Sequence, residues 1–394
     1  MRQRRIPATF MRGGTSKALV FHQHDLPSDR SVWPDLFRAA IGADDPNGRQ
    51  LDGMGGGISS LSKVCVIARS GREDADIDYS FFQLSPTNAS VDESANCGNM
   101  SSAMGPFAVD EGLVDVSGRE AEVRIYNTNT DKVIVSRFAV DEGQAAIDGG
   151  FELPGVAGRG SPVKLAFLRP GGARTGKILP TGNVVDRLTL ADGSSIQASC
   201  VDAANPCVFV RARDVGATAT ESPMALDGET ALLARLEAIR QAASVAMGIT
   251  ADLAQAASVP SAPKVAFVAP PAASTALDGS VLGEGDVDLL ARMISVGAPH
   301  RAIPLTGGLC TAVAAKITGT IVHEAARAGR EVRVGQPSGT TVVDADVYQL
   351  ENGAWHAETA SVVRTQRRLM DGFVYVSAEK TPGLDTSNIS QAAE

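Results

Sequence analysis

The sequence has no apolar run long enough to cross a bilayer, which argues against a membrane-spanning protein. Its first residues, Met1 to Arg5, are mostly basic, but Ile6 and Pro7 do not begin the apolar segment that a secretory signal peptide needs. From these two absences we expect a cytoplasmic protein with no membrane partner.

Cysteine is scarce as well: the 394-residue chain has five, an odd number, scattered and mostly within apolar strings. This pattern favours reduced thiols over a disulfide framework. The sequence also lacks Cys-x-x-Cys and His-x-x-x-His spacings, so it predicts no metal site.

Positively charged residues are fewer than negatively charged ones: the chain has 36 lysines and arginines and 45 aspartates and glutamates, which gives a net charge of −9. Nucleic acid is therefore not an expected partner. A small anionic substrate would need cations placed locally, and the sequence offers Arg12, Lys17, Lys63 and Arg301 for this purpose.

Glycine and proline, in contrast, are plentiful, with 40 and 20 residues, and they predict many turns between short strands. Short β-like strings recur throughout the chain: residues 64–68, 122–126, 133–138, 163–168, 207–211, 264–268, 332–334 and 374–376. The sequence therefore predicts a chain rich in short strands.

Four segments have helical patterns. Residues 229–247 read as an amphipathic surface helix, and residues 286–296 resemble them, with Asp286 as the N-cap. Residues 97–107 and 310–317 are small or apolar nearly all round, as central buried helices are.

The two buried helices each start at a cysteine near Gly and Ser/Thr residues, about half the chain apart. This repetition predicts a mixed α/β (α+β) fold of two similar domains with an active-site cleft between them, each domain being roughly 190 residues. We place the domains at 1–184 and 185–371, with a last strand near 372–378 that joins the first domain. Residues 384–394 read as a flexible tail.

The segment 94–102 contains the most informative residues. Cys97 is followed by Gly98 and Asn99 at the start of a buried helix, where unpaired N–H groups and the helix dipole favour an anion. A thiol in this place has a lowered pKa and can exchange protons. An isolated Cys-Gly-Asn could equally be a buried cysteine at a turn.

Two further segments of the first half could bind a carboxylate. Residues 11–17 combine two glycines with the cations Arg12 and Lys17 and the hydroxyls of Thr15 and Ser16. The other interpretation is a basic turn with helix-capping hydroxyls.

The glycine-rich segment 52–63 ends in Ser62 and Lys63, at the start of a strand, where a lysine can face a cleft. A base near neutral pH would need its pKa of ~10.4 lowered by desolvation or nearby cations. A surface lysine on an edge strand is the simpler interpretation.

The second half has similar polar segments beside strands, each of which could be an ordinary turn. The candidate substrate-binding residues there are Asn205, Arg301, Thr306, Gly307, Cys310, Thr311, Ser338 and Gly339. Thr306 to Thr311 open the second buried helix and form a second candidate anion site.

Taken together, these motifs resemble the PrpF-type isomerases, a family of methylaconitate, methylitaconate and oxalomesaconate isomerases. The resemblance runs from Ile6 to about Val376. It rests on several spaced motifs in one order: residues 11–17, 52–56, 62–63, 96–99, 180–183, 205–206, 263–268, 319–320 and 337–339. Residues 175–186 and 202–210 look most like the methylitaconate branch.

The resemblance implies a diaminopimelate-epimerase-like fold of two pseudo-equivalent domains, each a barrel-like sheet around a central helix. It implies a 1,3-proton shift in an unsaturated di- or tricarboxylate, with no cofactor or metal. Lys63 would be the main base, and Cys97 would lie in the site. A small anionic carboxylate is the expected partner, and a homo-oligomer is compatible with the family.

Two departures from the family pattern lie where substrate carboxylates are expected: Gln336 replaces a usual histidine, and residues 304–308 replace a Gly-Thr-Ala segment. Cys310 sits where epimerases of the wider fold carry a second catalytic cysteine. Two other functions therefore stay open, a two-thiol racemase or epimerase and a non-catalytic carboxylate-binding accessory protein.

Overall fold

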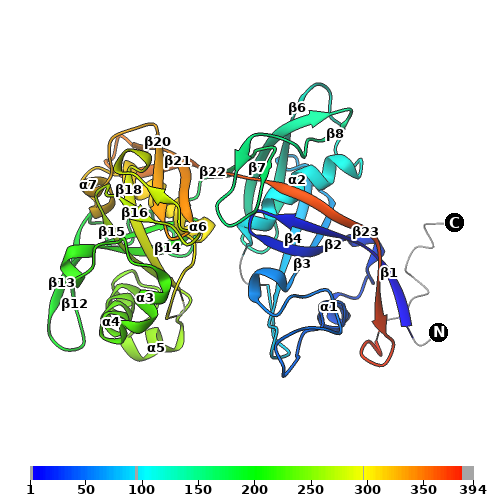
Figure 1. Cartoon of the computed structure of the whole chain (residues 1–394), viewed down its shortest axis with the longest axis horizontal. Coiled ribbons are helices and arrows are strands. Elements are labelled where there is room, and N and C mark those ends of the chain that lie inside the picture. The colour runs from blue at the N-terminus through cyan, green and yellow to red at the C-terminus, as the bar shows by residue number, and fades with distance from the viewer. Residues whose placement is uncertain (1–2, 94–95, 296, 384–394) are drawn as a thin grey trace. The chain divides into compact units, whose positions relative to one another are not determined.

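The computed structural model describes residues 3–93, 96–295 and 297–383. The predicted tail at 384–394 lies outside these residues, as do Val296 and residues 94–95. The chain divides into two compact units, which Figure 1 shows together. Unit 1 consists of Met1–Leu165 and Arg364–Glu394, and unit 2 of Ala166–Val363. The predicted domain boundary at residue 184 stays a prediction, because compactness does not show which segment folds alone.

Unit 1 is mostly sheet. Its α-helices are α1 (Trp33–Ile41) and α2 (Gly98–Asp110), and its 3-10 helices are η1 (Gln23–Asp25), η2 (Arg30–Val32) and η3 (Ser59–Leu61). Its strands are β1 (Gln3–Gly13), β2 (Ser16–His22), β3 (Lys63–Arg69), β4 (Ile77–Leu84), β5 (Val91–Asp92), β6 (Glu120–Asn127), β7 (Lys132–Asp141), β8 (Gln144–Ala145), β9 (Phe151–Glu152), β10 (Arg159–Gly160) and β23 (Gln366–Ser377). β11 (Val163–Leu168) and β22 (Trp355–Arg364) each contain a boundary between the units.

Unit 2 also combines many strands with a few helices. Its helices are α3 (Pro223–Gly228), α4 (Thr230–Ala246), α5 (Leu253–Ser258), α6 (Leu305–Lys316) and α7 (Ile321–Ala325), with η4 (Ala212–Val215) and η5 (Glu284–Asp286). Its strands are β12 (Asp186–Thr189), β13 (Ser195–Ala203), β14 (Asn205–Arg211), β15 (Lys264–Ala269), β16 (Ser274–Thr275), β17 (Val281–Leu282), β18 (Leu289–Ser295), β19 (Ala298–Pro299), β20 (Glu331–Gln336) and β21 (Gly339–Gln349). The structure is therefore mixed α/β and dominated by sheet.

The strands of unit 1 pair in alternating directions. β1 is antiparallel to β2, β2 parallel to β3, β3 antiparallel to β4, β4 parallel to β6, and β6 antiparallel to β7. The last strand, β23, runs antiparallel beside the first, β1 (Figure 1). Helix α2 contacts β1, β2, β6 and β7, and is buried along nearly its whole length. It is the central helix of this unit.

Unit 2 repeats this order of pairing. β13 is antiparallel to β14, β14 parallel to β15, β15 antiparallel to β18, β18 parallel to β20, and β20 antiparallel to β21. Helix α6 contacts β13, β14, β20 and β21, and is buried nearly all round.

Each unit has an Asp–Arg ion pair at the equivalent place, with the aspartate directly before a strand: before β4 in unit 1 and before β18 in unit 2. Asp76 accepts a hydrogen bond from Nη2 of Arg124 at 2.7 Å and another from the Arg124 backbone N–H at 2.7 Å. Asp288 accepts the same two bonds from Arg333, at 2.7 and 2.8 Å. In both pairs the backbone N–H of the aspartate donates to the backbone carbonyl of the arginine. The strand starts at Ile77 and Leu289 therefore correspond.

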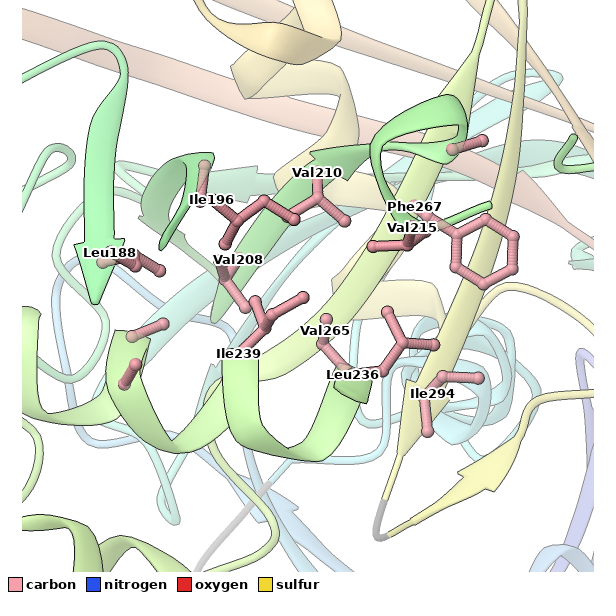
Figure 2. Close-up of a cluster of buried hydrophobic side chains, with 14 of the residues drawn as sticks. Leu188, Ile196, Val208, Val210, Val215, Leu236, Ile239, Val265, Phe267 and Ile294 are labelled. Carbon is pink, nitrogen blue, oxygen red and sulfur yellow. The ribbon is translucent and has the colours of Figure 1, made fainter. Parts of the chain in front are cut away.

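The core of each unit packs a helix on strands. In unit 1, Phe37 of α1 lies 4.8 Å from Phe82 of β4 and 5.7 Å from Phe21 of β2, between ring centroids. In unit 2, Leu236 and Ile239 of α4 point at strand residues that include Val208 and Val265 (Figure 2). Burying these apolar side chains removes them from water, which is the main stabilising contribution to folding.

The structure confirms the eight predicted strand segments, which lie in β3, β6, β7, β11, β14, β15, β20 and β23, and the helix predicted at 229–247, which is α4. The helix predicted at 286–296 is wrong, because Leu289–Ser295 form β18 after a short 3-10 turn at Glu284–Asp286. Leu289, Leu290, Ala291, Met293 and Ile294 are all buried, and an apolar run buried on both faces has no period that separates a strand from a helix. Asp286 accepts the Gly283 N–H in that turn and caps no α-helix.

The second buried helix was predicted to start at Cys310, which is wrong: α6 begins at Leu305. Its two glycines weaken the helical pattern. A Cβ on Gly307 would lie 2.5 Å from Sδ of Met293 on β18, so a larger residue there would require the Met293 side chain to move. Cys310 therefore lies in the middle of the helix.

Candidate active site

Strands β3 and β4 present a lysine, a thiol and a phenol on one face. Lys63 and Cys65 share a face because side chains alternate along a strand, and in the β3–β4 register they lie opposite Gln83 and Phe81. The Lys63 side chain is 7% exposed, and its Nζ lies 5.0 Å from the Phe81 ring centroid. Burial therefore separates Lys63 from an ordinary surface lysine.

Gln83 fixes the position of the Lys63 amino group. Its Oε1 accepts a hydrogen bond from Nζ of Lys63. Its Nε2 lies within 3.0 Å of the carbonyl oxygens of Ser59 and Ser62, which orients the amide with its oxygen toward the lysine. These two carbonyls belong to the segment that leads into β3, so the glycine-rich loop and the lysine are held by one side chain.

We expect Gln83→Met to lower kcat roughly tenfold to a hundredfold, because a displacement of about 1 Å in a reacting group has that order of effect. Gln144→Met, at an exposed glutamine of β8, is the control and should leave kcat unchanged. Steady-state kinetics on the isomerisation proposed below measure the effect. A Gln83→Met variant with wild-type kcat would show that Gln83 does not position Lys63.

Cys97 and Lys63 both lie close enough to the Cys65 thiol to influence its pKa. Burial, and next the nearby Cys97, raise the pKa of Cys65, whereas Lys63 acts in the opposite direction. Sγ of Cys65 lies 3.8 Å from Oη of Tyr79, whose pKa is also raised by burial first. Cys65 and Tyr79 are therefore neutral at physiological pH, and Cys97 is the thiol with access to solvent.

Cys97 is the N-cap residue of α2, the buried helix predicted over 97–107, and Gly98 and Asn99 are in its first turn. The Cys97 carbonyl accepts the N–H of Ser101 at 2.9 Å, while its thiol caps no helix amide among the residues that the structure describes. The helix dipole therefore acts on a side chain that is partly exposed and not used for capping.

Asn99 ties the start of α2 to the β1–β2 turn. Its Nδ2 donates to Oγ1 of Thr15 at 3.0 Å, and its Oδ1 accepts from Nε of Arg364 at 3.3 Å. Gly14 has φ +51°, and a Cβ there would lie 2.4 Å from Asn99 Oδ1, so only glycine fits. The structure thus brings together two predicted segments, 11–17 and 96–99.

The cations of the first segment contact the protein itself. Nη1 of Arg12 donates to the Gly14 carbonyl, the Thr365 carbonyl and Oγ1 of Thr365, all within 3.0 Å. Burial, and then Arg367, lower the pKa of Arg12. Nζ of Lys17 lies 5.4 Å from the Phe10 ring centroid, and Ser16 is buried. Arg12 therefore holds the turn in shape.

Ser62 has a comparable contact with the glycine-rich loop. Its buried Oγ lies 2.7 Å from Oε1 of Gln50 and 2.8 Å from the Ile58 carbonyl. Gln50 Oε1 also accepts the Gly57 N–H at 2.8 Å. Ser62 thus shapes the loop that precedes Lys63.

Arg364 belongs to none of the predicted site segments, and it is 6% exposed beside Asn99. Burial lowers its pKa to about 10, so it remains a cation at neutral pH. Nothing in the local sequence signals this, because Arg364 reaches α2 from the far end of the chain.

The predicted residues of unit 2 fall into two groups. Cys310 is fully buried, its Sγ donates to the Val201 carbonyl at 3.4 Å, and burial raises its pKa well above the ordinary value. Thr311 is buried too, and its Oγ1 donates to the Gly307 carbonyl at 2.8 Å. Thr306 and Gly307 lie in the first turn of α6.

The remaining candidates of unit 2 lie at strand starts or in the loops between elements. Nδ2 of Asn205 donates to the Pro206 carbonyl at 3.2 Å. Oγ of Ser338 donates to the carbonyl of the exposed Arg301, and its N–H to Oε1 of Gln336 at 2.9 Å. Gly339 has φ +129° and begins β21. The glutamine that replaces the family's histidine therefore caps its own turn.

Within the described residues, no helix could span a membrane, and no group of three or more His, Cys, Asp or Glu side chains could hold a metal ion. The site in unit 1 consists of the buried Lys63, the partly exposed thiol of Cys97 at the start of α2, and Asn99 with the buried Arg364 beside it.

The family model described as "PrpF protein" matches residues 3–377. The chain is 40% identical to the 3-methylitaconate isomerase of Eubacterium barkeri, over 96% of this chain and 99% of that relative. It is 39% identical to the 2-methyl-aconitate isomerase of Shewanella oneidensis, over 95% and 97%.

Solved structures agree with these relatives. A methylitaconate-delta-isomerase structure matches with a TM-score of 0.86 and 38% identity, covering 100% of this chain and 99% of that one. A probable proline racemase from Agrobacterium radiobacter K84 matches with a TM-score of 0.51 and 13% identity, covering 97% and 95%, which shows a shared fold alone. The predicted epimerase-like α/β fold class is confirmed.

Proposed function

The chain belongs to the PrpF family, and on this basis we propose that it is an isomerase that moves a proton between two carbons of an unsaturated di- or tricarboxylate. The observation that carries the proposal is the buried Lys63, held by Gln83 in the same electrostatic cluster as Cys97 at the start of α2. The relatives' names suggest 3-methylitaconate and 2-methylaconitate as substrates, and oxalomesaconate is the third acid to test.

The chemistry uses acid and base groups of the chain. A proton that is α to a carboxylate and allylic to a double bond is acidic, because the resulting dienolate spreads its charge over both ends. Lys63, as the neutral amine, removes this proton, the double bond moves, and Lys63 or Cys97 returns a proton at the γ carbon. The N–H groups of Gly98 and Asn99 stabilise negative charge on the carboxylate.

Deuterium incorporation tests this proposal. In heavy water, turnover of 3-methylitaconate should place deuterium in the new methyl group, seen by proton NMR, and conjugation should raise the ultraviolet absorbance. Methylaconitate and oxalomesaconate are tested in the same way. If none of the three acids exchanges a C–H proton, the protein is not this isomerase, and a carboxylate-binding accessory role is supported.

A racemase with two catalytic thiols would need Cys310 to reach its substrate. Cys310 is buried and bonded to Val201, so we expect Cys310→Ala to keep kcat within a few-fold of wild type. Cys200→Ala, at a second fully buried thiol of unit 2, is the matched control for packing effects. An inactive, folded Cys310→Ala variant together with a racemised amino or hydroxy acid would support the racemase instead.

A further inference from the structure

Unit 2 contains a pocket whose lining includes none of the candidate site residues. Its volume is about 380 Å³, which falls in the range of about 300 to 1,000 Å³ that small-molecule pockets occupy. One wall comes from residues within 169–182, after β11, and the other from residues 353–357, at the start of β22. Both segments belong to unit 2, so the pocket is formed within one unit.

The first wall contains a motif that the proposed mechanism does not use. Residues 180–183 are among the motifs on which the family resemblance rests, and residues 175–186 look most like the methylitaconate branch. Residues between Gly176 and Gly182 line the pocket. The motif therefore shapes a cavity of unit 2, and proton transfer at Lys63 does not account for it.

The buried carboxylate of Asp202 holds this wall in shape. Its Oδ2 accepts hydrogen bonds from the N–H groups of Arg174 and Thr175, at 2.9 and 2.7 Å, and from Oγ1 of Thr175 at 2.8 Å. The Asp202 N–H donates to the Ile178 carbonyl, and its carbonyl accepts the Gly172 N–H, both at 2.8 Å. The wall is therefore preformed, which lowers the cost of ordering it around a ligand.

Positively charged side chains gather at the pocket. Its lining includes Arg169, Lys177 and His356 and, among the residues that the structure describes, no aspartate or glutamate. The negative charges nearby are the buried Asp202, which three donors stabilise, and Glu358, whose carboxylate lies 3.1 Å from Nε2 of His356. In a chain with a net charge of −9, this lining favours an anion.

The two permanent cations of the lining are not used by the protein itself. Within residues 3–93, 96–295 and 297–383, no hydrogen bond or ion pair involves the Arg169 guanidinium or the Lys177 ammonium. The Arg169 backbone has φ +45°, a conformation that is uncommon for a residue with a Cβ, and its N–H donates to the Glu358 carbonyl at 2.8 Å. The chain thus keeps a strained residue at the edge of the pocket.

Trp355 gives the pocket an aromatic surface. It is half-buried at the start of β22, and the apolar residues Ile178, Leu179 and Ala357 share the lining with it. An indole ring packs well against another flat ring, and guanidinium and ammonium groups bind carboxylates and phosphates. A ligand that uses both features carries its negative charge on a planar ring system.

We propose that this pocket binds an organic anion with a planar ring, in which Arg169 and Lys177 contact a carboxylate or phosphate group and Trp355 contacts the ring. The site goes beyond the proposed function. It lies in unit 2 and requires none of the residues assigned to the isomerisation.

Intrinsic fluorescence tests this site because the chain has two tryptophans. Trp33 is 2% exposed in the core of unit 1, whereas Trp355 lines the pocket. Adenosine monophosphate and phthalate are the probes, and they distinguish a phosphate from a carboxylate ligand. We expect at least one of them to change the emission of the wild type with a Kd of about 1 mM or lower. Trp355→Phe should lose this change in emission.

Calorimetry with the same probe measures the contribution of each cation. Arg169→Met and Lys177→Met should each weaken its binding about tenfold, because each removes one charge-assisted contact. Arg169→Lys, which keeps the charge, should recover part of the affinity. Arg235→Met, at an exposed arginine of α4, is the control and should leave the affinity unchanged. Circular dichroism checks that the variants fold, which we expect because Arg169 and Lys177 are exposed.

Three results would overturn the inference. The first is that neither probe binds the wild type. The second is wild-type affinity in both Arg169→Met and Lys177→Met, which would place the probe elsewhere. The third, if adenosine monophosphate binds, is equal affinity for adenosine, its uncharged analogue, which would contradict a role for the cations. None of these outcomes depends on isomerisation, so a chain that exchanges no deuterium can still bind the probe here, and an active isomerase can fail to bind it.

Discussion

Lys63→Ala is expected to abolish isomerisation, with kcat lowered about a thousandfold or more, while the protein remains folded. General base catalysis contributes roughly a hundredfold to ten-thousandfold, and Lys63 is the base in the proposed mechanism. The strand should survive because its other residues, including Val64 and Cys65, remain buried between their neighbours.

Circular dichroism and thermal melting check the fold of Lys63→Ala, and deuterium exchange checks proton removal apart from turnover. Lys63→Met keeps the apolar stem against the Phe81 ring, so it separates the loss of packing from the loss of the amine. Lys164→Ala, at an exposed lysine of β11, is the control. Near wild-type exchange in either Lys63 variant would remove this residue from the role of base.

Local patterns predicted the elements whose burial has a clear period. Helix α4 was predicted almost to its ends, because Leu236 and Ile239 fall on one face with charged residues between. The start of α2 was predicted from a cysteine, a glycine and an asparagine. For β18 and the start of α6 the patterns failed. A segment that is buried on all sides is apolar throughout, so it has no periodicity that would distinguish a strand from a helix or mark where a helix begins.

The partners of the site were beyond the reach of sequence patterns. Lys63 was predicted as a candidate base, but its contact Gln83 comes from a different strand, and Arg364 reaches Asn99 from the last part of the chain. Contacts of this kind depend on which strands pair and in which register, and a single sequence does not specify either. The residue-level repeat of the two units emerges only when Asp76 and Asp288 are compared with their arginines.

Cys97→Ser is expected to be folded and impaired, with kcat lowered about tenfold to a hundredfold, and so to lose less than Lys63→Ala. Serine keeps a hydroxyl at the N-cap, a position that serine favours, so α2 should form normally. The hydroxyl is a much weaker acid than a thiol of pKa ~8.5, so return of a proton to the γ carbon should slow if Cys97 supplies it.

The position of the thiol explains why the expected loss is partial. Cys65 is fully buried and burial raises its pKa, so its thiol is a weaker acid than an ordinary thiol and does not replace Cys97 as the proton donor. Lys63, once protonated by the substrate, can return that proton itself. Cys65→Ser, a matched change at the buried thiol, is the control and should leave the pH–rate profile unchanged.

Exchange and turnover in heavy water distinguish the possible roles of Cys97. If Cys97 returns the proton, Cys97→Ser should still wash deuterium into the α position while product formation falls. Complete loss of exchange in Cys97→Ser, equal to that in Lys63→Ala, would show an obligatory thiol of the kind that two-thiol epimerases need. Unchanged exchange and turnover would leave Lys63 as both acceptor and donor, with the proton carried from the α to the γ carbon on one face of the dienolate.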